Sequence, residues 1–354
     1  MYNILVINPG STSTKIGIFE DEKCVFKETL RHSIEDTLAD VDREEQAALR
    51  RRELIKLLGK KNIDESNLSA VVVRGGLLKP LSSGTYLVDD SVYADLVKAK
   101  YGWHASNLGT IIALPLAREL GIPVYTVDPV TVDEFEAPAR YSGLKGVLRL
   151  SMSHALNMKA VARRAAAMAE REYEELNLIV VHLGSGISVS AHRRGKMIDV
   201  NNANEEGPFS LERCGTMPAL ALVRLCYSGE YDRDEAIKLL TSRGGIFSYL
   251  DTKDFSEVEN RVKNGDEEVT AVVEAMAYQV AKEIGAMSTV LDGDVEQILL
   301  TGGMANAETL VGMIKKKVSF IASVTVIPGE EELEALAAGA LRVLRGQADV
   351  LSYQ

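Results

Sequence analysis

The sequence has few of the residues that would indicate a secreted, membrane or metal-scaffold protein. Its three cysteines, Cys24, Cys214 and Cys226, are odd in number and widely separated, and their spacing matches no metal site. We therefore expect reduced thiols in a cytoplasmic protein. No apolar run approaches the ~20 residues that a membrane-spanning helix needs. The N-terminus also lacks the charged-then-apolar pattern of a signal peptide.

Positive charge is scarce relative to negative charge. The 354 residues include 40 Lys and Arg against 51 Asp and Glu, which gives a net charge of −11. Such a protein disfavours nucleic acid and anionic membranes as partners, so local cations must collect any anionic substrate. The arginines at residues 50–52 lie in a helix expected from about residue 43 to 58, and a solvated helix face explains them better than a nucleic-acid patch does.

What the chain does contain is a buried-strand pattern at residues 4–7, followed by the stretch NPGSTSTK at residues 8–15. A glycine turn between two strands exposes backbone N–H groups, Ser and Thr add hydroxyl donors, and Lys15 adds a charge. That combination suits a phosphate oxygen. An ordinary hairpin with a polar tip explains the same residues equally well.

A second stretch repeats this order. An apolar run at residues 178–181 precedes the glycine-rich turn HLGSG at residues 182–186, and two further strand patterns follow as far as residue 200. Two strand–loop–strand–turn–strand units in one chain indicate an internal duplication. Two phosphate loops on duplicated halves can face each other across a cleft and hold a polyphosphate between them.

Charged side chains follow two other predicted strands. Arg74 follows the strand at residues 70–73 and precedes a glycine pair, while Asp128 follows the strand at residues 123–127. Open α/β sheets place ligand groups at these strand ends, and a carboxylate there suits magnesium or an orienting role. Arg74 is equally well explained as a surface arginine beside a flexible turn.

Three helix starts have two explanations each. His104 precedes a helix at residues 110–120, where it either neighbours an ordinary N-cap or lies beside a bound anion. The stretch TGGMAN at residues 301–306 links a strand to a helix, which is a weak nucleotide-contact pattern by itself. The acids at residues 330–332 open the last long helix, as the helix dipole alone would favour.

Taken together, these stretches resemble the acetate/butyrate kinase family, which belongs to the group with the actin, Hsp70 and sugar-kinase fold. NPGSTSTK resembles the N-terminal signature of that family, and HLGSG resembles its second signature. Five further stretches look closest to butyrate kinases: HASNLG at 104–109, VDPV at 127–130, GPFSLERCG at 207–215, SRGG at 242–245 and PGEEE at 328–332. The resemblance covers nearly the whole chain.

The resemblance implies an α/β fold of two duplicated actin-like (ribonuclease H-like) domains with an active-site cleft between them. Residues 1–130 and a returning helix within 330–354 would form the first domain, and residues 131–329 the second, nucleotide-binding domain. The reaction implied is Mg²⁺-ATP-dependent phosphorylation of butyrate, or a similar short-chain carboxylate, to an acyl phosphate and ADP. The expected protein is a cytoplasmic homo-oligomer, a dimer or higher, with no nucleic-acid or membrane partner.

Other functions stay open at this point. A kinase for acetate, propionate or a branched acid is the alternative within the class. A nucleotide-switched binding protein on the same fold is the alternative from another class, and a structural filament protein has only the fold in its favour.

The resemblance also assigns roles to residues, some of which have simpler explanations. Arg74 and Arg213 would contact the carboxylate and the transferring phosphoryl group, although Arg213 also fits a surface arginine. Asp128, His182 and His104 complete the catalytic set. The phosphate and nucleotide contacts implied are Asn8, Ser11, Ser13, Lys15, Gly184, Ser185, Gly186, Gly302, Gly303 and Asn306.

Magnesium is assigned to Asp128, Glu332 and Asn8, although the adjacent Glu330 and Glu331 leave the register of that glutamate open. The chain departs from the family pattern at one place. A histidine that stabilises the transition state in acetate kinases falls here on Leu150, beside Arg149, so His182, the arginines or both would take its role.

Overall fold

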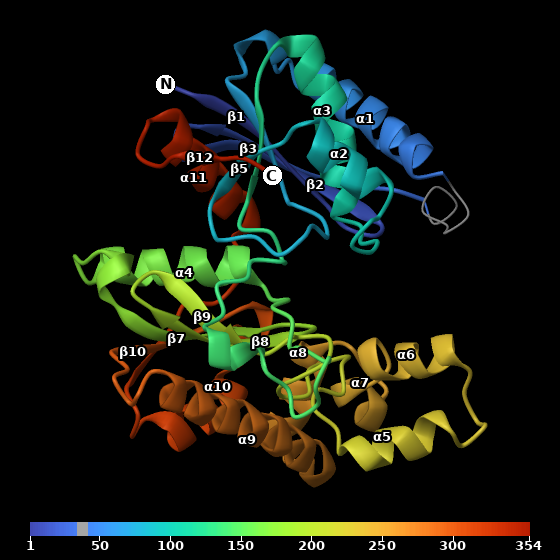
Figure 1. The fold of residues 1–354 in the computed structure, drawn as a ribbon, viewed down its shortest axis with the longest axis vertical. Coiled ribbons are helices and arrows are strands. Elements are labelled where there is room, and N and C mark those ends of the chain that lie inside the picture. The colour runs from blue at the N-terminus through green and yellow to red at the C-terminus, as the bar shows by residue number, and fades with distance from the viewer. Residues whose placement is uncertain (34–41) are drawn as a thin grey trace. The chain divides into compact units, whose positions relative to one another are not determined.

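The computed structural model describes residues 1–33 and 42–354, which form two compact α/β units (Figure 1). Unit 1 comprises Met1–Val132 and Glu331–Gln354, and unit 2 comprises Asp133–Glu330. Each unit is built on one mixed sheet, so the predicted α/β class is confirmed. Within the described residues, no helix combines the length and the apolar character needed to cross a bilayer.

Unit 1 contains a seven-stranded sheet in the order β12-β5-β6-β4-β1-β2-β3. Its strands are β1 (Asn3–Pro9), β2 (Ser13–Glu20), β3 (Lys23–Arg31), β4 (Ala70–Val73), β5 (Thr85–Leu87), β6 (Val124–Val127) and β12 (Val350–Leu351). Its helices are α1 (Arg43–Lys60), α2 (Asp90–Val97), α3 (Asn107–Leu120) and α11 (Glu332–Leu344), with the 3₁₀ turn η2 (Glu65–Asn67).

The returning helix α11 packs directly on the unit 1 sheet, against β1, β4 and β6. Its approach to β6 depends on a glycine, because a Cβ at Gly339 would lie 2.5 Å from a methyl carbon of Val127. The Thr85 hydroxyl also donates to the Gly339 carbonyl, at 3.1 Å. The C-terminal segment is therefore part of the core of unit 1.

Unit 2 contains a five-stranded sheet in the order β11-β10-β7-β8-β9. Its strands are β7 (Asn177–Leu183), β8 (Ile187–Arg193), β9 (Lys196–Val200), β10 (Gln297–Thr301) and β11 (Ser323–Val326). Its helices are α4 (Ala155–Met168), α5 (Ala219–Cys226), α6 (Arg233–Thr241), α7 (Gly245–Leu250), α8 (Phe255–Lys263), α9 (Glu267–Val290) and α10 (Glu308–Val318). The 3₁₀ turns are η3 (Ala137–Arg140), η4 (Tyr173–Glu175) and η5 (Gly303–Asn306). Helix α4 lies on one face of this sheet, and α9 and α10 lie on the other (Figure 1).

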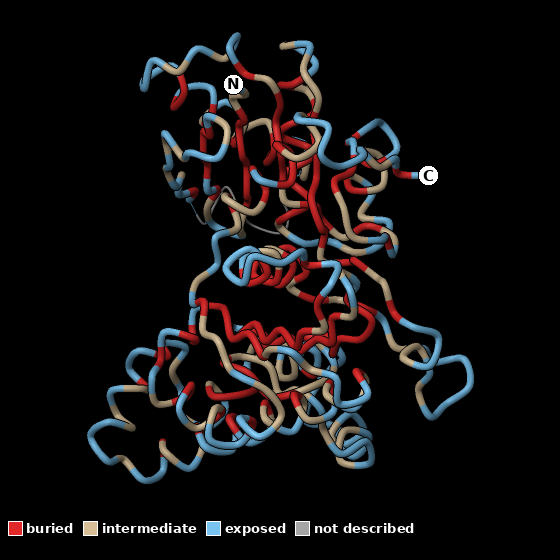
Figure 2. The backbone as a smooth tube through the Cα atoms, turned by 90° about the vertical axis from the view of Figure 1, so that its left-hand side faces the viewer, coloured by how far each residue is buried: buried red, intermediate tan, exposed pale blue. Residues whose placement is uncertain are grey.

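Five strands of the unit 1 sheet, in the order β6-β4-β1-β2-β3, share the topology of the unit 2 sheet, as the repeated sequence pattern predicted. In unit 1, β1 pairs antiparallel with β2 and parallel with β4. In unit 2, β7 pairs antiparallel with β8 and parallel with β10. The next antiparallel pair in each unit also contains a register shift. It lies between Ile18 and Phe19 in the β2–β3 pair and between Ala191 and His192 in the β8–β9 pair. The central strands are buried throughout (Figure 2), which is why their sequences read as unbroken apolar runs.

Strand β12 follows β11 in the chain and pairs in parallel with β5 in unit 1. One expectation about the elements needs correction. The solvated helix face expected at residues 50–52 is wrong for Arg50, which is 2% exposed.

Candidate active-site residues in the two units

A cluster of charged and amide side chains lies where β1 and β4 end in unit 1. These strands are parallel, and their register pairs Ile7 with Val73, so Asn8 and Arg74 are the next residues on neighbouring strands. Arg74 Nη1 lies 2.8 Å from Glu332 Oε1, and Asn8 Nδ2 donates to Glu332 Oε2 at 2.6 Å. We call Asn8, Arg74 and Glu332 the strand-end cluster. The cluster thus brings together three predicted site residues that are far apart in the sequence, at positions 8, 74 and 332.

Of the three adjacent acids, Glu332 is the one in this cluster. Glu331 is the N-cap residue of α11, and Glu330 Oε1 lies 3.1 Å from His182 Nε2 in unit 2. No three His, Cys, Asp or Glu side chains group as a metal cage within the described parts of the chain. Magnesium is commonly held by one or two carboxylates together with substrate phosphates and waters, so the oxygens of Asn8 and Glu332 fit that ion.

Asp128 is a buried residue at the end of β6, with a positive φ of 40°. Its Oδ1 accepts a hydrogen bond of 2.6 Å from the Ser83 hydroxyl and one of 2.8 Å from the Gly84 amide. These contacts hold the turn that precedes β5. The contacts of this oxygen fit an orienting role for Asp128, and its predicted role at magnesium stays a proposal.

The first glycine loop, residues 10–14, joins β1 to β2 as a tight turn in which the Gly10 amide donates to the Ser13 carbonyl at 2.7 Å. Ser11 and Lys15 are exposed, and Ser13 is intermediate. Behind the loop lies Arg50 of α1, whose guanidinium contacts this turn from the buried side. Arg50 is not among the residues predicted for the site.

His104 lies just before α3 and is exposed. Its Nδ1 lies 2.8 Å from the Ser106 hydroxyl and accepts from the Ser106 amide at 3.2 Å. Asn107 Oδ1 accepts from the Leu77 amide at 3.0 Å, which ties the start of α3 to the turn after Arg74. Ser106 is the N-cap residue of α3 but makes no side-chain capping hydrogen bond. The anion role of His104 therefore stays a proposal beside the capping explanation.

In unit 2, the guanidinium of Arg213 lies against the second glycine loop. A Cβ placed on Gly186 would lie 2.3 Å from Arg213 Nη1 and 2.7 Å from Cζ, so only glycine admits this packing. Arg213 Nη1 also donates to the Ala203 carbonyl at 3.0 Å. Burial lowers the pKa of the Arg213 guanidinium below its usual value, but arginine remains charged in proteins.

A cavity of about 290 Å³ opens beside this loop. Four predicted nucleotide contacts line it, namely Gly184, Ser185, Gly303 and Asn306. Its apolar wall includes Leu211, Phe255 and Met304, and Glu259, Ser256 and Glu330 add polar groups. Such a mixture of apolar walls and a few polar groups is typical of small-molecule sites.

Gly302 is close to this cavity but has a packing role. Its φ is 91°, and a Cβ there would lie 2.4 Å from the Leu183 carbonyl oxygen. Its backbone also exchanges hydrogen bonds with Gly329, at 3.2 and 3.0 Å. The contacts of Gly302 therefore join the loops after β7, β10 and β11.

His182 is buried at the end of β7 and is held on two sides. Its Nδ1 lies 2.9 Å from Asn157 Oδ1, and its Nε2 lies on the side of Glu330. Its ring stacks on that of His154, with centroids 3.9 Å apart and planes 9° apart. His154 in turn contacts the Ser188 hydroxyl. Asn157 is not among the predicted residues, and its position one turn after His154, the N-cap residue of α4, was the available signal.

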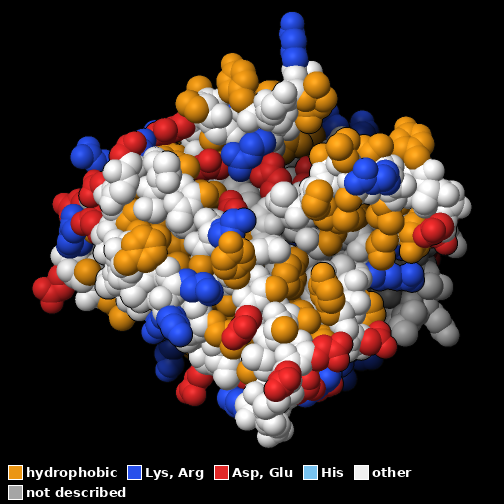
Figure 3. Space-filling model, turned by 90° about the horizontal axis from the view of Figure 1, so that it is seen from below, with side chains coloured by type: hydrophobic (Ala, Val, Ile, Leu, Met, Phe, Trp, Pro, Cys, Tyr) orange, Lys and Arg blue, Asp and Glu red, His pale blue; other side chains and the backbone are white. Residues whose placement is uncertain are grey.

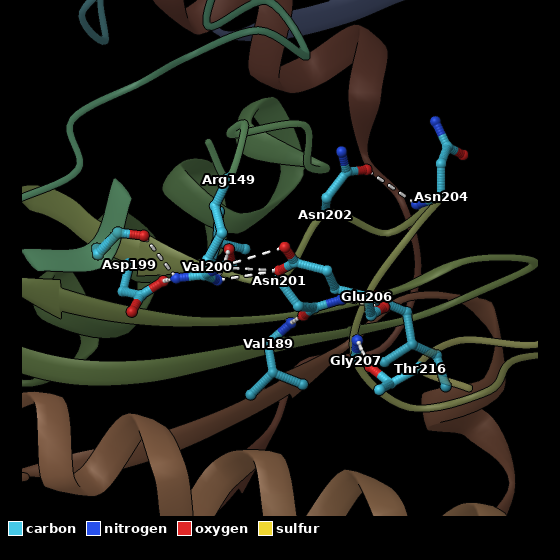
Figure 4. A network of polar contacts seen from close by, with 12 residues as sticks. Arg149, Val189, Asp199, Val200, Asn201, Asn202, Asn204, Glu206, Gly207 and Thr216 are labelled. Atoms are coloured by element: carbon cyan, nitrogen blue, oxygen red, sulfur yellow. Dashed lines mark hydrogen bonds and ion pairs between the residues drawn. The ribbon is translucent and has the colours of Figure 1, made fainter. Parts of the chain in front are cut away.

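Leu150, where acetate kinases carry a histidine, is 55% exposed, and the neighbouring Arg149 points into the protein. Figure 4 shows the Arg149 guanidinium between the Asp199 and Glu206 carboxylates, at 3.0 Å from each. It also donates to the Val200 carbonyl at 3.1 Å. Burial raises the pKa of Asp199 above its usual value, and the charge of Arg149 offsets only part of this rise. Arg149 therefore fixes the segment at residues 199–206.

This segment also carries the carbonyl that holds Arg213. Asn201 anchors it to β8, since its Oδ1 accepts from the Val189 amide at 2.6 Å and its Nδ2 donates to the Ile187 carbonyl at 2.9 Å (Figure 4). Ala203 lies two residues further on and accepts from Arg213. Arg149 and Asn201 thus support the position of Arg213 indirectly.

Comparisons with known proteins agree with this fold. The acetate kinase of Porphyromonas gingivalis superposes with a TM-score of 0.80 at 19% identity, over 97% of this chain and 100% of that chain. A propionate kinase from Francisella tularensis subsp. tularensis SCHU S4 gives 0.75 at 18% identity, over 96% and 99% of the two chains. The acetate kinase of Entamoeba histolytica gives 0.75 at 17% identity, over 95% and 98%.

At such identities these structures show the shared fold, and the family rests on a separate match. The model of the Acetokinase family matches residues 129–328, which is more than half of the chain. The chain therefore belongs to the Acetokinase family, whose members are carboxylate kinases that use ATP with Mg²⁺.

Proposed function

We propose that this protein transfers the γ-phosphoryl group of ATP to a short-chain carboxylate, with butyrate as its preferred acceptor, and that the reaction is reversible. The observation that carries this proposal is a guanidinium at a glycine loop or strand end in each unit. Arg74 belongs to the strand-end cluster of unit 1, and Arg213 lies against Gly186 in unit 2.

Two anions must approach each other in this reaction, so catalysis depends mostly on positioning and charge neutralisation. The acceptor has a pKa of about 4 to 5, like that of Glu, and is already ionised at neutral pH, so it needs no general base. Planar guanidinium groups match carboxylate and phosphoryl oxygens in pairs. We assign Arg74 to the acceptor and Arg213 to the transferring group, with His182 as a donor to one of its oxygens.

Magnesium would be held by Asn8 and Glu332 together with the phosphates, with Asp128 orienting the neighbouring turn. Bound Mg²⁺ supplies further neutralisation of the phosphate charge. We assign the nucleoside to the cavity lined by Gly184, Ser185, Gly303 and Asn306. The first loop, with Ser11, Ser13 and Lys15, would hold a phosphate.

The preference for butyrate rests on the motifs that look closest to butyrate kinases. Acetate and propionate are the second candidates, because the superposed structures include acetate kinases and a propionate kinase. Each methylene buried in an apolar pocket contributes ~0.8 kcal/mol, or about fourfold in affinity. Two methylenes then favour butyrate over acetate by about 15-fold.

The test is formation of acyl hydroxamate from Mg²⁺-ATP, hydroxylamine and a series of acids from acetate to pentanoate, including isobutyrate. We expect the most product from butyrate. Equal or greater turnover of acetate would overturn the substrate assignment and leave the kinase standing. ATP hydrolysis that no carboxylate alters would overturn the kinase proposal and favour a nucleotide-switched binding protein.

We also propose that copies of this chain associate in the cytoplasm. Helix α5 buries none of its residues, and Leu220 and Val223 on it, with Tyr227 just after it, are exposed. Figure 3 shows hydrophobic side chains in several groups among interspersed charges on one face of the molecule. Light scattering should give at least a dimer, and Leu220→Glu should reduce it to a monomer. A monomeric wild type would refute this proposal.

A further inference from the structure

The first glycine loop has its carbonyl groups turned toward a buried cation. Arg50 Nη1 donates to the Gly10 carbonyl at 2.8 Å and to the Ser13 carbonyl at 3.3 Å, and Nη2 donates to the Ser11 carbonyl at 2.8 Å. Nη1 also lies 3.3 Å from the Thr14 hydroxyl. One guanidinium therefore binds four acceptors within five consecutive residues.

The geometry of the peptide bond turns this contact into a prediction about the amides. In a trans peptide unit the C=O and N–H bonds point in opposite directions, and the described chain has no cis peptide bonds. Because the carbonyls of Gly10 and Ser11 point at Arg50, the amides of Ser11 and Thr12 point away from it. Both residues are exposed, so these amides face solvent. Successive N–H groups in a turn form a concavity that binds anions.

A second set of contacts holds the same loop beside Arg50. His32 Nε2 lies 2.8 Å from the Thr14 hydroxyl, and His32 Nδ1 lies 2.8 Å from Glu53 Oε2. The His32 amide donates to the Thr12 carbonyl at 3.0 Å. Burial lowers the pKa of Arg50, and the charge of Glu53 acts against that shift. The loop is therefore fixed from the protein side.

We propose that Arg50 is a positioning residue for anion binding: it draws the carbonyls of the 10–14 loop inward so that the amides of Ser11 and Thr12 receive a phosphoryl group of the nucleotide. This inference rests on the proposed function and adds to it the residue that shapes the loop. The fork of one guanidinium holds three carbonyls, which a lysine ammonium cannot reproduce. Without this hold, carbonyl oxygens would turn outward and repel the phosphate.

The first experiment compares Arg50→Lys and Arg50→Met with Arg52→Met, which removes an exposed cation from the same helix. Affinities for Mg²⁺-ADP and for adenosine are measured by calorimetry, beside melting temperatures. We expect both Arg50 variants to bind Mg²⁺-ADP about 10- to 100-fold more weakly, since one or two hydrogen bonds to a charged acceptor are lost. Adenosine should bind as to wild type, because it has no phosphate, and Arg52→Met should bind both ligands normally.

A purely structural role predicts a different pattern. If adenosine and Mg²⁺-ADP weaken together as the melting temperature falls, Arg50 only ties α1 to the loop and the inference is overturned. Wild-type Mg²⁺-ADP affinity in a folded Arg50→Lys would overturn it as well. If Arg50→Met does not fold, the lysine variant carries the comparison, because it keeps the aliphatic stem and the charge.

A second measurement needs no variant. Hydrogen exchange of the amides of Ser11 and Thr12 should slow at least tenfold with Mg²⁺-ADP or pyrophosphate and stay unchanged with adenosine. An active kinase whose loop amides gain no protection would refute this inference alone. Protection by pyrophosphate in a protein that makes no acyl phosphate would support the anion loop and refute the proposed function.

Discussion

Replacing Gly186 by alanine tests the position of Arg213 without removing its charge. The new Cβ would lie 2.3 Å from Arg213 Nη1 and 2.7 Å from Cζ, whereas non-bonded carbon atoms rest at about 3.5 to 4.0 Å. The guanidinium must therefore move by about 1 Å. It is the far end of a flexible side chain, so the movement costs little stability. A displacement of about 1 Å in a catalytic group can lower turnover by about 100-fold.

We therefore expect Gly186→Ala to lower kcat by about 100-fold while the melting temperature stays near that of wild type. The assay is steady-state hydroxamate formation with butyrate, beside thermal melts. Gly312→Ala on α10 is the control, because a Cβ there meets nothing within 4 Å. It should leave kcat unchanged. Normal turnover in a folded Gly186→Ala would show that the location of this guanidinium does not matter to the reaction.

The remaining predictions use charge rather than packing. Arg213→Ala should lower kcat by about 10³-fold or more, and Arg213→Lys should recover little of it, since a point charge does not replace the fork; near-normal kinetics with a normal melt would exclude the clamp. Glu332→Gln should keep an amide contact near Asn8 yet raise the Mg²⁺ concentration for half-maximal rate about 10-fold or more, as measured by Mg²⁺ titration; an unchanged titration would remove Glu332 from the metal site. Burial raises the pKa of Glu283, and the charges of Asp199 and Glu206 add to that effect while Arg149 opposes it. A carboxyl whose pKa is raised on folding contributes stability at acid pH that is lost as the pH rises through the raised value. Glu283→Gln should therefore raise the melting temperature at pH 7 to 8 and change it little near pH 4, and an equal change at both pH values would contradict this sign.

Much of the fold could be predicted from local patterns. The apolar runs at residues 4–7, 70–73 and 178–181 are central strands, and Asp42 caps α1 by accepting from the amides of Glu44 and Glu45. The short strands β5 and β12 could not be predicted this way. They have two or three residues each and form by pairing with distant strands. Strand β5 pairs with β6, about 40 positions later, and β12 pairs with β5 across more than 260 positions. No local period indicates such a pairing.

In the candidate site, too, the local motifs could be predicted and the long-range contacts could not. The loops at residues 8–15 and 182–186 are local motifs and were visible in the sequence, whereas the side chains that hold them come from distant positions. Arg50 lies 40 residues from Gly10, and Asn157 lies 25 residues from His182. One signal for Arg50 was available. The buried residues Ala47, Arg50, Leu54 and Leu57 recur every three or four positions on α1, so Arg50 belongs to the apolar face of the helix.

Counting donors separates the arginines that shape the site from the one that can serve the reaction. Among the described residues, Arg50 donates to four acceptors on one loop, and Arg149 donates to two carboxylates and two carbonyls. A guanidinium has five N–H donors, so the group of Arg149 is almost fully used by the chain itself, whereas Arg50 directs both of its terminal nitrogens to one loop. In that same part of the chain, Arg213 donates to one acceptor, the Ala203 carbonyl. We therefore expect its remaining donors to serve phosphoryl oxygens. Its substitution should then affect turnover, whereas substitution of Arg50 should affect the binding of phosphate.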